Sequence, residues 1–242
     1  IYRIYIENTD LDKIDLLRVE LENFSFIHSS TYEFKRKIFH TPNDPMYSNQ
    51  WFLNQINTPQ AWDFWSIPSG NHPNNDNILL ASVDTGVDWD HPDLINNIWQ
   101  NLGEDADGDG HTIEYISGNW VLDPGDLNEI DDDNWDGNPA SLIDDLIGWD
   151  FSGWSGEEDN NPIPKSGVSP YSTWSHGTHV AGILGATTDN GVGIASTTYN
   201  GNVLCIKVSR EQQTGTPYIT EGYLGILYAA QLGYFNGGFT II

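Results

Sequence analysis

The stretch Ser175-His176-Gly177-Thr178-His179-Val180-Ala181-Gly182-Ile183-Leu184-Gly185-Ala186 decides how this chain folds. Small residues at helical spacing along it allow a helix to pack its backbone close to a neighbouring element. Ser175 or Thr178 is placed to cap the N-terminus, where unpaired N–H groups and the positive end of the helix dipole lie. An imidazole held at that end titrates near neutral pH, as a general base must. The stretch therefore predicts a closely packed helix that carries its chemistry on His176.

Two short apolar runs, residues 77–84 and 201–208, predict strands that are buried on both faces. Continuous apolar runs of this length are typical of parallel sheets covered by helices. A helix over 220–232, with Thr220 as its cap and Gly233 at its end, and a third strand from residue 239 continue the pattern. We therefore predict an α/β domain with a mostly parallel sheet and helices on both faces. Because the sequence stops inside the third strand, we expect this domain to be incomplete at its C-terminus.

The N-terminal residues form a separate module in this interpretation. Residues 1–7 and 24–34 have strand patterns, and a helix is expected from Asp10 to Glu20. Lys35-Arg36-Lys37 is either a solvated turn or a processing junction, and turn-forming residues follow it. We therefore place a boundary at about residue 39, which divides the chain into 1–39 and 40–242. A further helix is expected over 50–65, with Pro59 in a first turn.

The charge distribution excludes some partners. The chain has a formal net charge of −26, and no Lys or Arg lies between Glu104 and Asp159. Such an acidic surface repels nucleic acid and anionic membranes, and no apolar stretch is long enough to span a bilayer. One cysteine, Cys205, excludes a disulfide within the chain. The acids are either a solvated face or a set of ligands for bound cations, and ligand spacing distinguishes the two.

Asp84 and His176 are the candidate catalytic residues. Asp84 ends a predicted buried strand, which is where α/β folds place their chemistry. An acid at that position can orient an imidazole and stabilise its protonated form, so the two residues are two members of an Asp–His–nucleophile set. His176, His179 and Asp84 can also be interpreted as metal ligands, which would define a metal hydrolase.

Two blocks of sequence resemble the subtilisin-like serine proteases, or subtilases. They are Val83-Asp84-Thr85-Gly86-Val87-Asp88-Trp89-Asp90-His91-Pro92-Asp93-Leu94 and His176-Gly177-Thr178-His179-Val180-Ala181-Gly182, in the family's order of Asp before His. The resemblance covers most of residues 40–242. It implies a secreted endopeptidase, made as a zymogen, that cleaves protein or peptide substrates with an Asp–His–Ser triad.

The family's oxyanion Asn and nucleophilic Ser have no matching motif in these 242 residues. The resemblance therefore implies that this chain is the N-terminal portion of a protease and is inactive by itself. The first alternative is a pseudoprotease or inactive fragment that acts as a calcium-binding or interaction module. The second is the metal hydrolase described above.

Two acidic loops in a predicted insertion at about 100–170 have the spacing of calcium ligands. Asp105, Asp107 and Asp109 occupy positions 1, 3 and 5 of a loop with Gly at position 6, as in the start of an EF-hand. The second loop repeats the pattern with Asp132, Asn134 and Asp136. Asp144 or Asp145 is its candidate distal acid. Alternating carboxylates of this kind predict Ca²⁺ as the cofactor.

The resemblance to subtilases implies one more calcium site and a role for the N-terminal module. Asp44, Asp93 and the loop with Asp189 match positions that share a calcium ion in calcium-stabilised subtilases. Residues 1–39 resemble, by position and pattern, the C-terminal part of a subtilase propeptide. Such a propeptide assists folding and inhibits the mature enzyme, so it is expected to be a partner of residues 40–242.

Overall fold

The structure is a computed structural model that describes residues 11–30, 40–65, 67, 77–133, 142–152, 158–168, 171–210 and 212–242. The chain divides into two compact units, Ile1–Ile38 and Phe39–Ile242. No helix in the described part of the chain has the length and apolar character needed to cross a membrane.

The described residues of the smaller unit contain one helix, α1 (Leu11–Glu22), which extends two residues beyond the prediction. The predicted strand over 24–34 is wrong for residues 24–30, because the chain turns there. The Ile27 N–H donates to the Phe24 carbonyl at 2.9 Å, and the Ser30 hydroxyl donates to the Glu22 carboxylate at 2.7 Å. The predicted strand over 1–7 lies outside the described residues.

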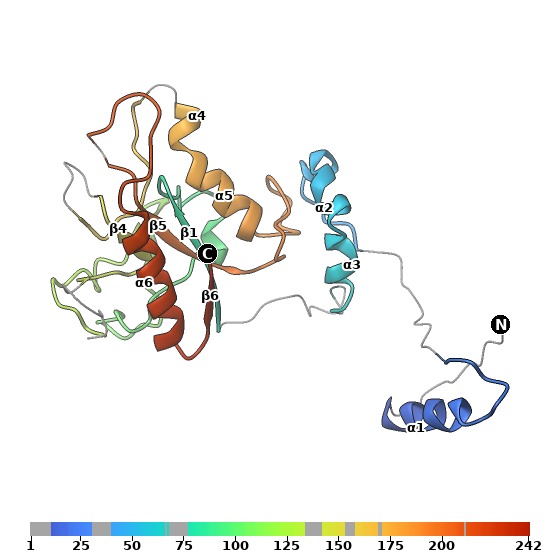
Figure 1. The fold of residues 1–242 in the computed structure, drawn as a ribbon. Helices are drawn as coiled ribbons and strands as arrows, with labels where there is room; N and C mark the ends of the chain where they lie inside the picture. Colours follow the sequence, from blue (N-terminus) through green and yellow to red (C-terminus); the bar gives the residue numbers. More distant parts are fainter. Residues whose placement is uncertain are drawn as a thin grey trace. The chain divides into compact units, whose positions relative to one another are not determined.

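In the described residues of the larger unit, a sheet has four parallel strands in the order β4-β5-β1-β6 (Figure 1). Their bounds are β1 Ile78–Asp84, β4 Gly148–Asp150, β5 Asn202–Lys207 and β6 Phe239–Ile241. The predicted strands over 77–84, 201–208 and 239–242 are confirmed. β4 was not predicted, because its three residues lie inside the expected insertion. At the carboxyl edge of the sheet, Lys207 of β5 is the register partner of both Asp150 in β4 and Asp84 in β1.

Helices α5 (His176–Gly185) and α6 (Gly222–Phe235) lie on opposite faces of this sheet (Figure 1). Alternate strand residues divide between the two cores, since side chains of a strand alternate between faces. Val203 and Cys205 pack with Ala181 of α5, whereas Leu204 and Ile206 pack with Tyr228 of α6. The predicted α/β fold with a mostly parallel sheet and helices on both faces is confirmed.

The predicted bounds of two helices are wrong. Residues 50–65 form α2 (Trp51–Gln55) and α3 (Thr58–Trp62), separated by Asn57 in the left-handed conformation at φ 59°. Pro59 lacks the N–H that would continue α2 into one longer helix. α6 has Glu221 as its N-cap and runs through Gly233, because that glycine packs closely against β6. Thr220 instead donates its hydroxyl to the Val208 carbonyl.

The predicted insertion at about 100–170 contains a short antiparallel hairpin besides β4. Its strands are β2 (Ile113–Ile116) and β3 (Asn119–Leu122), and Ile113 pairs with Leu122. The remaining short elements in the described residues are α4 Tyr171–Trp174 and the 3₁₀ turns η1 Tyr47–Asn49 and η3 Ile95–Asn97. A third core cluster lies under α2 and α3, where Leu53 and Trp62 are fully buried.

Candidate active site

Helix α5 begins at His176 and approaches the carboxyl end of β1 closely. A Cβ atom at Gly177 would collide with the Gly86 carbonyl oxygen, and one at Gly185 would collide with the Val203 side chain. Larger residues at these two helix positions would therefore push α5 away from the sheet. The small residues of the sequence thus place His176 beside the strand end that carries Asp84.

The cap of α5 differs from the prediction. Ser175 is the N-cap residue but makes no side-chain capping bond, and the Thr178 hydroxyl accepts the Asp88 N–H at 3.0 Å. The buried Thr85 hydroxyl accepts the Gly177 N–H at 3.0 Å and donates to the Trp174 carbonyl at 2.8 Å. The first turn is therefore capped by a residue from the end of β1, which local sequence around the helix cannot reveal.

Asp84 and His176 are in direct contact. Nδ1 of His176 lies 2.9 Å from Oδ1 and 2.8 Å from Oδ2 of Asp84. The Thr85 N–H donates to Oδ1 of Asp84 at 2.7 Å, which holds the carboxylate in place. A carboxylate only accepts hydrogen bonds, so this contact places a proton on Nδ1 and leaves Nε2 of a neutral imidazole as the base. The His176 side chain is 63% exposed and that of Asp84 16%, so the histidine is accessible to a substrate.

The alternative metal site at the same place has no support in the geometry. In the described part of the chain, the groups of three or more acids and histidines whose ligand atoms lie within 4.8 Å of one another do not include Asp84, His176 or His179. His179 is exposed one turn further along α5. The structure thus brings together the two predicted catalytic residues and leaves His179 apart from them.

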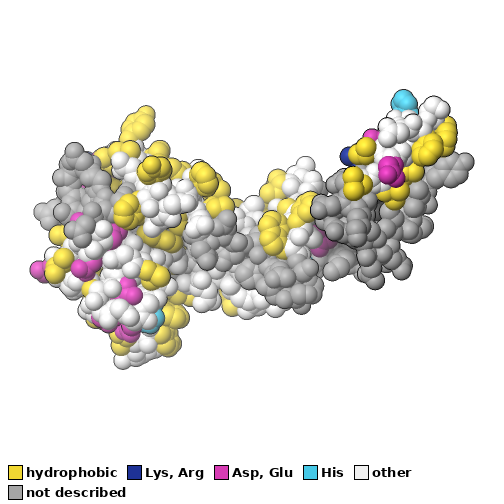
Figure 2. All heavy atoms as spheres, turned by 90° about the horizontal axis from the view of Figure 1, so that it is seen from below, with side chains coloured by type: hydrophobic (Ala, Val, Ile, Leu, Met, Phe, Trp, Pro, Cys, Tyr) yellow, Lys and Arg dark blue, Asp and Glu magenta, His cyan; other side chains and the backbone are white. Residues whose placement is uncertain are grey.

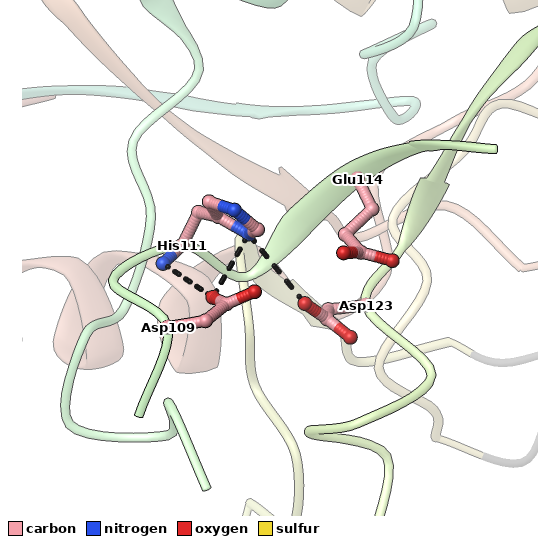
Figure 3. Close-up of side chains that lie close together, drawn as sticks. All are labelled: Asp109, His111, Glu114 and Asp123. Carbon is pink, nitrogen blue, oxygen red and sulfur yellow. Dashed lines mark hydrogen bonds and ion pairs between the residues drawn. The ribbon is translucent and has the colours of Figure 1, made fainter. Parts of the chain in front are cut away.

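The first predicted calcium loop divides between two clusters. Asp105 and Asp107 lie with Asp126, which is fully buried, and these three residues form what we call the Asp126 cluster. Oδ1 of Asp126 accepts the Ala106 N–H at 2.8 Å, whereas its Oδ2 is buried without a hydrogen bond. Burial, and then the charges of nearby aspartates, raises the pKa of Asp126. Asp109 belongs to the second cluster, with His111, Glu114 and Asp123 (Figure 3).

A third group, the Glu104 cluster, consists of Glu104, Asp131 and Asp133. Glu104 is 1% exposed, and its Oε1 accepts the Asp133 N–H at 3.0 Å. Its Oε2 is buried without a hydrogen bond. Burial raises the pKa of Glu104 to about 7, and the charges of Asp133 and Asp131 act in the same direction.

Only part of the second predicted calcium loop can be located. Asn134 and Asp136 lie outside the described residues. Asp132 accepts a hydrogen bond from the Asn128 side chain at 2.6 Å, and its charge contributes to a raised pKa of Asp144, of which burial is the main cause. Asp145 is 1% exposed and its two oxygens accept hydrogen bonds from Asn101 and Tyr228, both at 2.6 Å.

Asp44 and Asp93 converge on the loop after α5. The Asp189 N–H donates to Asp44 at 2.8 Å, and the Asn190 side chain donates to Asp93 at 2.9 Å. Oδ1 of Asp44 is buried without a hydrogen bond, and burial raises the pKa of this carboxyl. The Asp189 carboxylate lies against other groups, since it accepts the Asn43 N–H at 2.9 Å and lies 3.1 Å from His40. Asn190 thus donates a hydrogen bond to Asp93, while the carboxylate of the predicted ligand Asp189 is held by Asn43 and His40.

Several acids of these clusters were missed by the sequence analysis. Ligand spacing indicates only the acids within each loop, whereas each cluster joins residues 14 or more positions apart, as Asp126 joins Asp105. Figure 2 shows acidic side chains recurring over one part of the larger unit's visible face. The turn Asp123-Pro124-Gly125-Asp126 is the local signal that could have indicated two of the missed residues. The other missed members are Glu104, His111, Glu114, Asp131 and Asp133.

The chain is similar in sequence to a family of known proteases. The model of the subtilase family matches residues 75–230. The chain is 31% identical over 199 residues to the extracellular basic protease of Dichelobacter nodosus, across 81% of this chain and 26% of that protein. It is 30% identical over 195 residues to thermitase of Thermoactinomyces vulgaris, across 80% of this chain and 45% of that protein. A solved protease structure from Pseudoalteromonas arctica aligns with a TM-score of 0.47 at 24% identity, over 79% of this chain and 44% of that one.

A parallel α/β sheet with an Asp–His pair at its carboxyl edge is a framework for hydrolytic chemistry. The chain belongs to the subtilase family of serine proteases. It spans about a quarter of the first of these two relatives and less than half of the second.

Proposed function

We propose that this chain supplies the acid and the base of a serine endopeptidase. Asp84 orients His176, and His176 moves the proton of a serine nucleophile. The observation that carries the proposal is the contact of Nδ1 of His176 with both oxygens of Asp84, at 2.9 and 2.8 Å. Family membership supports the same roles, because subtilases are serine proteases.

The reaction follows from the protonation state of this pair. Nε2 of His176 accepts the serine hydroxyl proton while the serine oxygen bonds to the peptide carbonyl carbon. Asp84 stabilises the imidazolium that forms. The same proton then passes from Nε2 to the leaving amine as the peptide C–N bond breaks. Water repeats the sequence on the acyl-enzyme, and the serine is regenerated with a free carboxylate product.

The nucleophile in this proposal comes from polypeptide outside the 242 residues, because none of their serines stands in the family's nucleophile motif. The chain alone is therefore inactive as a protease. Proteins or peptides are the substrates of the longer protein. Secretion is proposed from the name of one relative, an extracellular protease. We propose residues 1–39 as part of an inhibitory propeptide.

The test compares this chain with the chain extended by the coding sequence downstream of Ile242. We expect no hydrolysis of fluorescent casein by the 242 residues and clear hydrolysis by the extended protein. His176→Ala should lower kcat of the extended protein by about 10⁶-fold, as loss of the equivalent base does in a related enzyme. His179→Ala is the matched control and should keep kcat within about tenfold, because His179 is exposed and apart from Asp84. A stop codon after Ile242 would overturn the proposal and favour a calcium-binding module. Full activity of His176→Ala would overturn it by showing that His176 is not the base.

Calcium is the proposed cofactor of the acidic loops. Asp126, Glu104 and Asp44 each bury a carboxylate oxygen without a hydrogen bond, and nearby acids leave that negative charge uncompensated. Clusters of carboxylate oxygens are the ligands that Ca²⁺ prefers, so the residues present fit this ion. Bound calcium would supply positive charge there and hold the loops together.

Removal of calcium tests this assignment. At about 100 times the Kd, one calcium ion stabilises the folded state by about 2.7 kcal/mol. For a chain of this size that corresponds to roughly 5–10 °C in Tm. We therefore expect EDTA to lower Tm by at least this amount and added Ca²⁺, but not Mg²⁺, to restore it. Asp126→Asn should reduce the number of bound calcium ions by one, while the exposed Glu158→Gln should not. An unchanged Tm in EDTA would refute the assignment.

A further inference from the structure

The hairpin β2–β3 and the turn before it gather a nitrogen ligand among carboxylates. Asp109 and His111 precede β2, Glu114 lies within it, and Asp123 follows β3. One ligand atom from each of these four residues, which we call the His111 cluster, lies within 4.8 Å of the others. Figure 3 shows the four side chains close together, from the turn before β2, from β2 itself and from the residue after β3. The antiparallel register produces this arrangement, because Ile113 pairs with Leu122 and so brings the two ends of the hairpin together.

Two atoms inside the His111 cluster are buried and lack hydrogen bonds. Asp123 is 2% exposed, and its Oδ2 has no hydrogen-bond partner. Nδ1 of His111 also has no hydrogen-bond partner. It lies 3.5 Å from Oδ2 of Asp123 and 3.0 Å from Oδ1 of Asp109. A buried carboxylate is costly unless a positive group or a metal compensates it. An electron-pair acceptor placed among these atoms would satisfy the nitrogen and the oxygen together.

The donor set selects the kind of ion. Calcium takes oxygen ligands, whereas imidazole together with carboxylates suits zinc and similar first-row ions. Zinc binds His nitrogen and Asp or Glu oxygen at about 2.0–2.2 Å, mostly with four ligands, and the edges of such a tetrahedron are about 3.3–3.6 Å. The two distances from His111 Nδ1, 3.0 and 3.5 Å, are close to those edges. We infer that Asp109, His111, Glu114 and Asp123 bind a divalent transition-metal ion, with Zn²⁺ as the best fit.

This site is distinct in chemistry from the calcium clusters next to it. Every member of the Asp126 cluster and of the Glu104 cluster is a carboxylate, and neither cluster includes a histidine. The two classes of ion should therefore divide between the clusters, calcium at the oxygen-only clusters and zinc at His111. Zinc there would fasten the base of the β2–β3 hairpin to the acidic loop that contains Asp109.

The test measures zinc binding to the whole chain in saturating Ca²⁺. Metal is removed with a chelator, the chain is returned to calcium buffer, and Zn²⁺ is titrated by calorimetry. We expect one tight site per chain. Loss of a residue that only supports a ligand costs about 10–100-fold in affinity, so His111→Ala, which removes a ligand, should weaken Zn²⁺ binding by about 100-fold or more. Asp123→Asn should act likewise, and Co²⁺ in the intact site should give the visible absorption of a tetrahedral ion.

The exposed histidine His28 offers a matched control. His28→Ala removes an imidazole that belongs to none of the ligand groups in the described residues, and it should leave zinc binding unchanged. Because His111 is 43% exposed, His111→Ala should fold, as far-ultraviolet circular dichroism can verify. The inference is overturned if no stoichiometric zinc binds in calcium buffer. It is also overturned if His111→Ala retains the tight site. Protease activity enters none of these measurements, so the two proposals fail separately.

Discussion

The carboxylates at the edge of the parallel sheet and those of the acidic loops are compensated in opposite ways. Asp150 at the end of β4 is 1% exposed, and its Oδ2 lies 2.8 Å from Nζ of the equally buried Lys207. Its Oδ1 accepts the Ser152 N–H at 2.7 Å. In the loops, Glu104 and Asp126 are just as buried, yet each keeps one oxygen without a hydrogen bond.

The difference shows in which region the polypeptide itself supplies the groups that compensate buried carboxylates. At the sheet edge, strand register sets Lys207 between Asp150 and Asp84, so a cation and hydrogen-bond donors come from the fold. The loops lie in a stretch from Glu104 to Asp159 that contains no Lys or Arg, so the proposed calcium ions would have to supply their compensating charge. His176 therefore contacts the edge of the sheet at which the fold itself supplies a cation, Lys207, for a buried carboxylate.

The largest effect is expected from breaking the ion pair at the sheet edge. Lys207→Met leaves Asp150 buried without its cation, which costs about 3–5 kcal/mol of unfolding free energy. Urea unfolding followed by tryptophan fluorescence measures this loss. The matched control is Arg210→Met, since the Arg210–Glu221 pair is exposed, with 54% of the arginine side chain accessible. Exposed pairs contribute about 0–1 kcal/mol, so equal losses in the two variants would contradict the comparison.

A smaller effect, about 3 kcal/mol, is expected from Glu104 in the metal-free chain. Burial raises its pKa from the usual 4.5 to about 7 in the folded state. Between these two values the folded state binds a proton that the unfolded state has released. Unfolding free energy in EDTA should therefore fall as pH rises from 4.5 to 7, at 1.36 kcal/mol per pKa unit. Calcium should flatten this dependence, because it favours the ionised carboxylate.

Glu104→Gln should remove this pH dependence, and chemical unfolding at several pH values in EDTA measures it. The exposed Glu158→Gln provides the control and should keep the wild-type dependence. If the unfolding free energy of Glu104→Gln still falls by the full amount between pH 4.5 and 7, then the buried Glu104 carboxylate does not destabilise the metal-free loops. The proposed difference between the loops and the sheet edge would then be wrong.

The sheet edge was predictable from sequence because its signals are local. Each buried strand is one apolar run, and the small residues of α5 indicate close packing before any partner is known. Asp84 and His176 lie 92 residues apart, but each stands at the end of a recognisable element, so their contact follows once the elements are assigned. β4 escaped prediction because three residues carry too little periodicity to distinguish a strand from a loop.

The acidic loops resisted prediction because their clusters are not local. Spacing within Asp105-Ala106-Asp107-Gly108-Asp109 suggested one shell, but the backbone turn sends Asp107 toward Asp126 and Asp109 toward Asp123. Position along the chain gave no reason to pair Glu104 with Asp133, which is 29 residues away. Ligand spacing therefore led to the prediction of cation binding, while the members of each cluster required the folded arrangement of the loops.

The smallest effect is expected at Thr85, and it tests whether the catalytic corner is organised without ions. Thr85→Val keeps the shape of the side chain but leaves the Gly177 N–H and the Trp174 carbonyl without their partner, inside a buried site. Loss of such bonds costs about 1–2 kcal/mol of unfolding free energy. Since Asp84, the acid next to Thr85, belongs to none of the acidic clusters in the described residues, the loss should be equal in Ca²⁺ and in EDTA. Thr85→Ser, which keeps the hydroxyl, is the matched control and should lose less. A loss that appears only in EDTA would mean that the loops, rather than the sheet edge, hold α5 against β1.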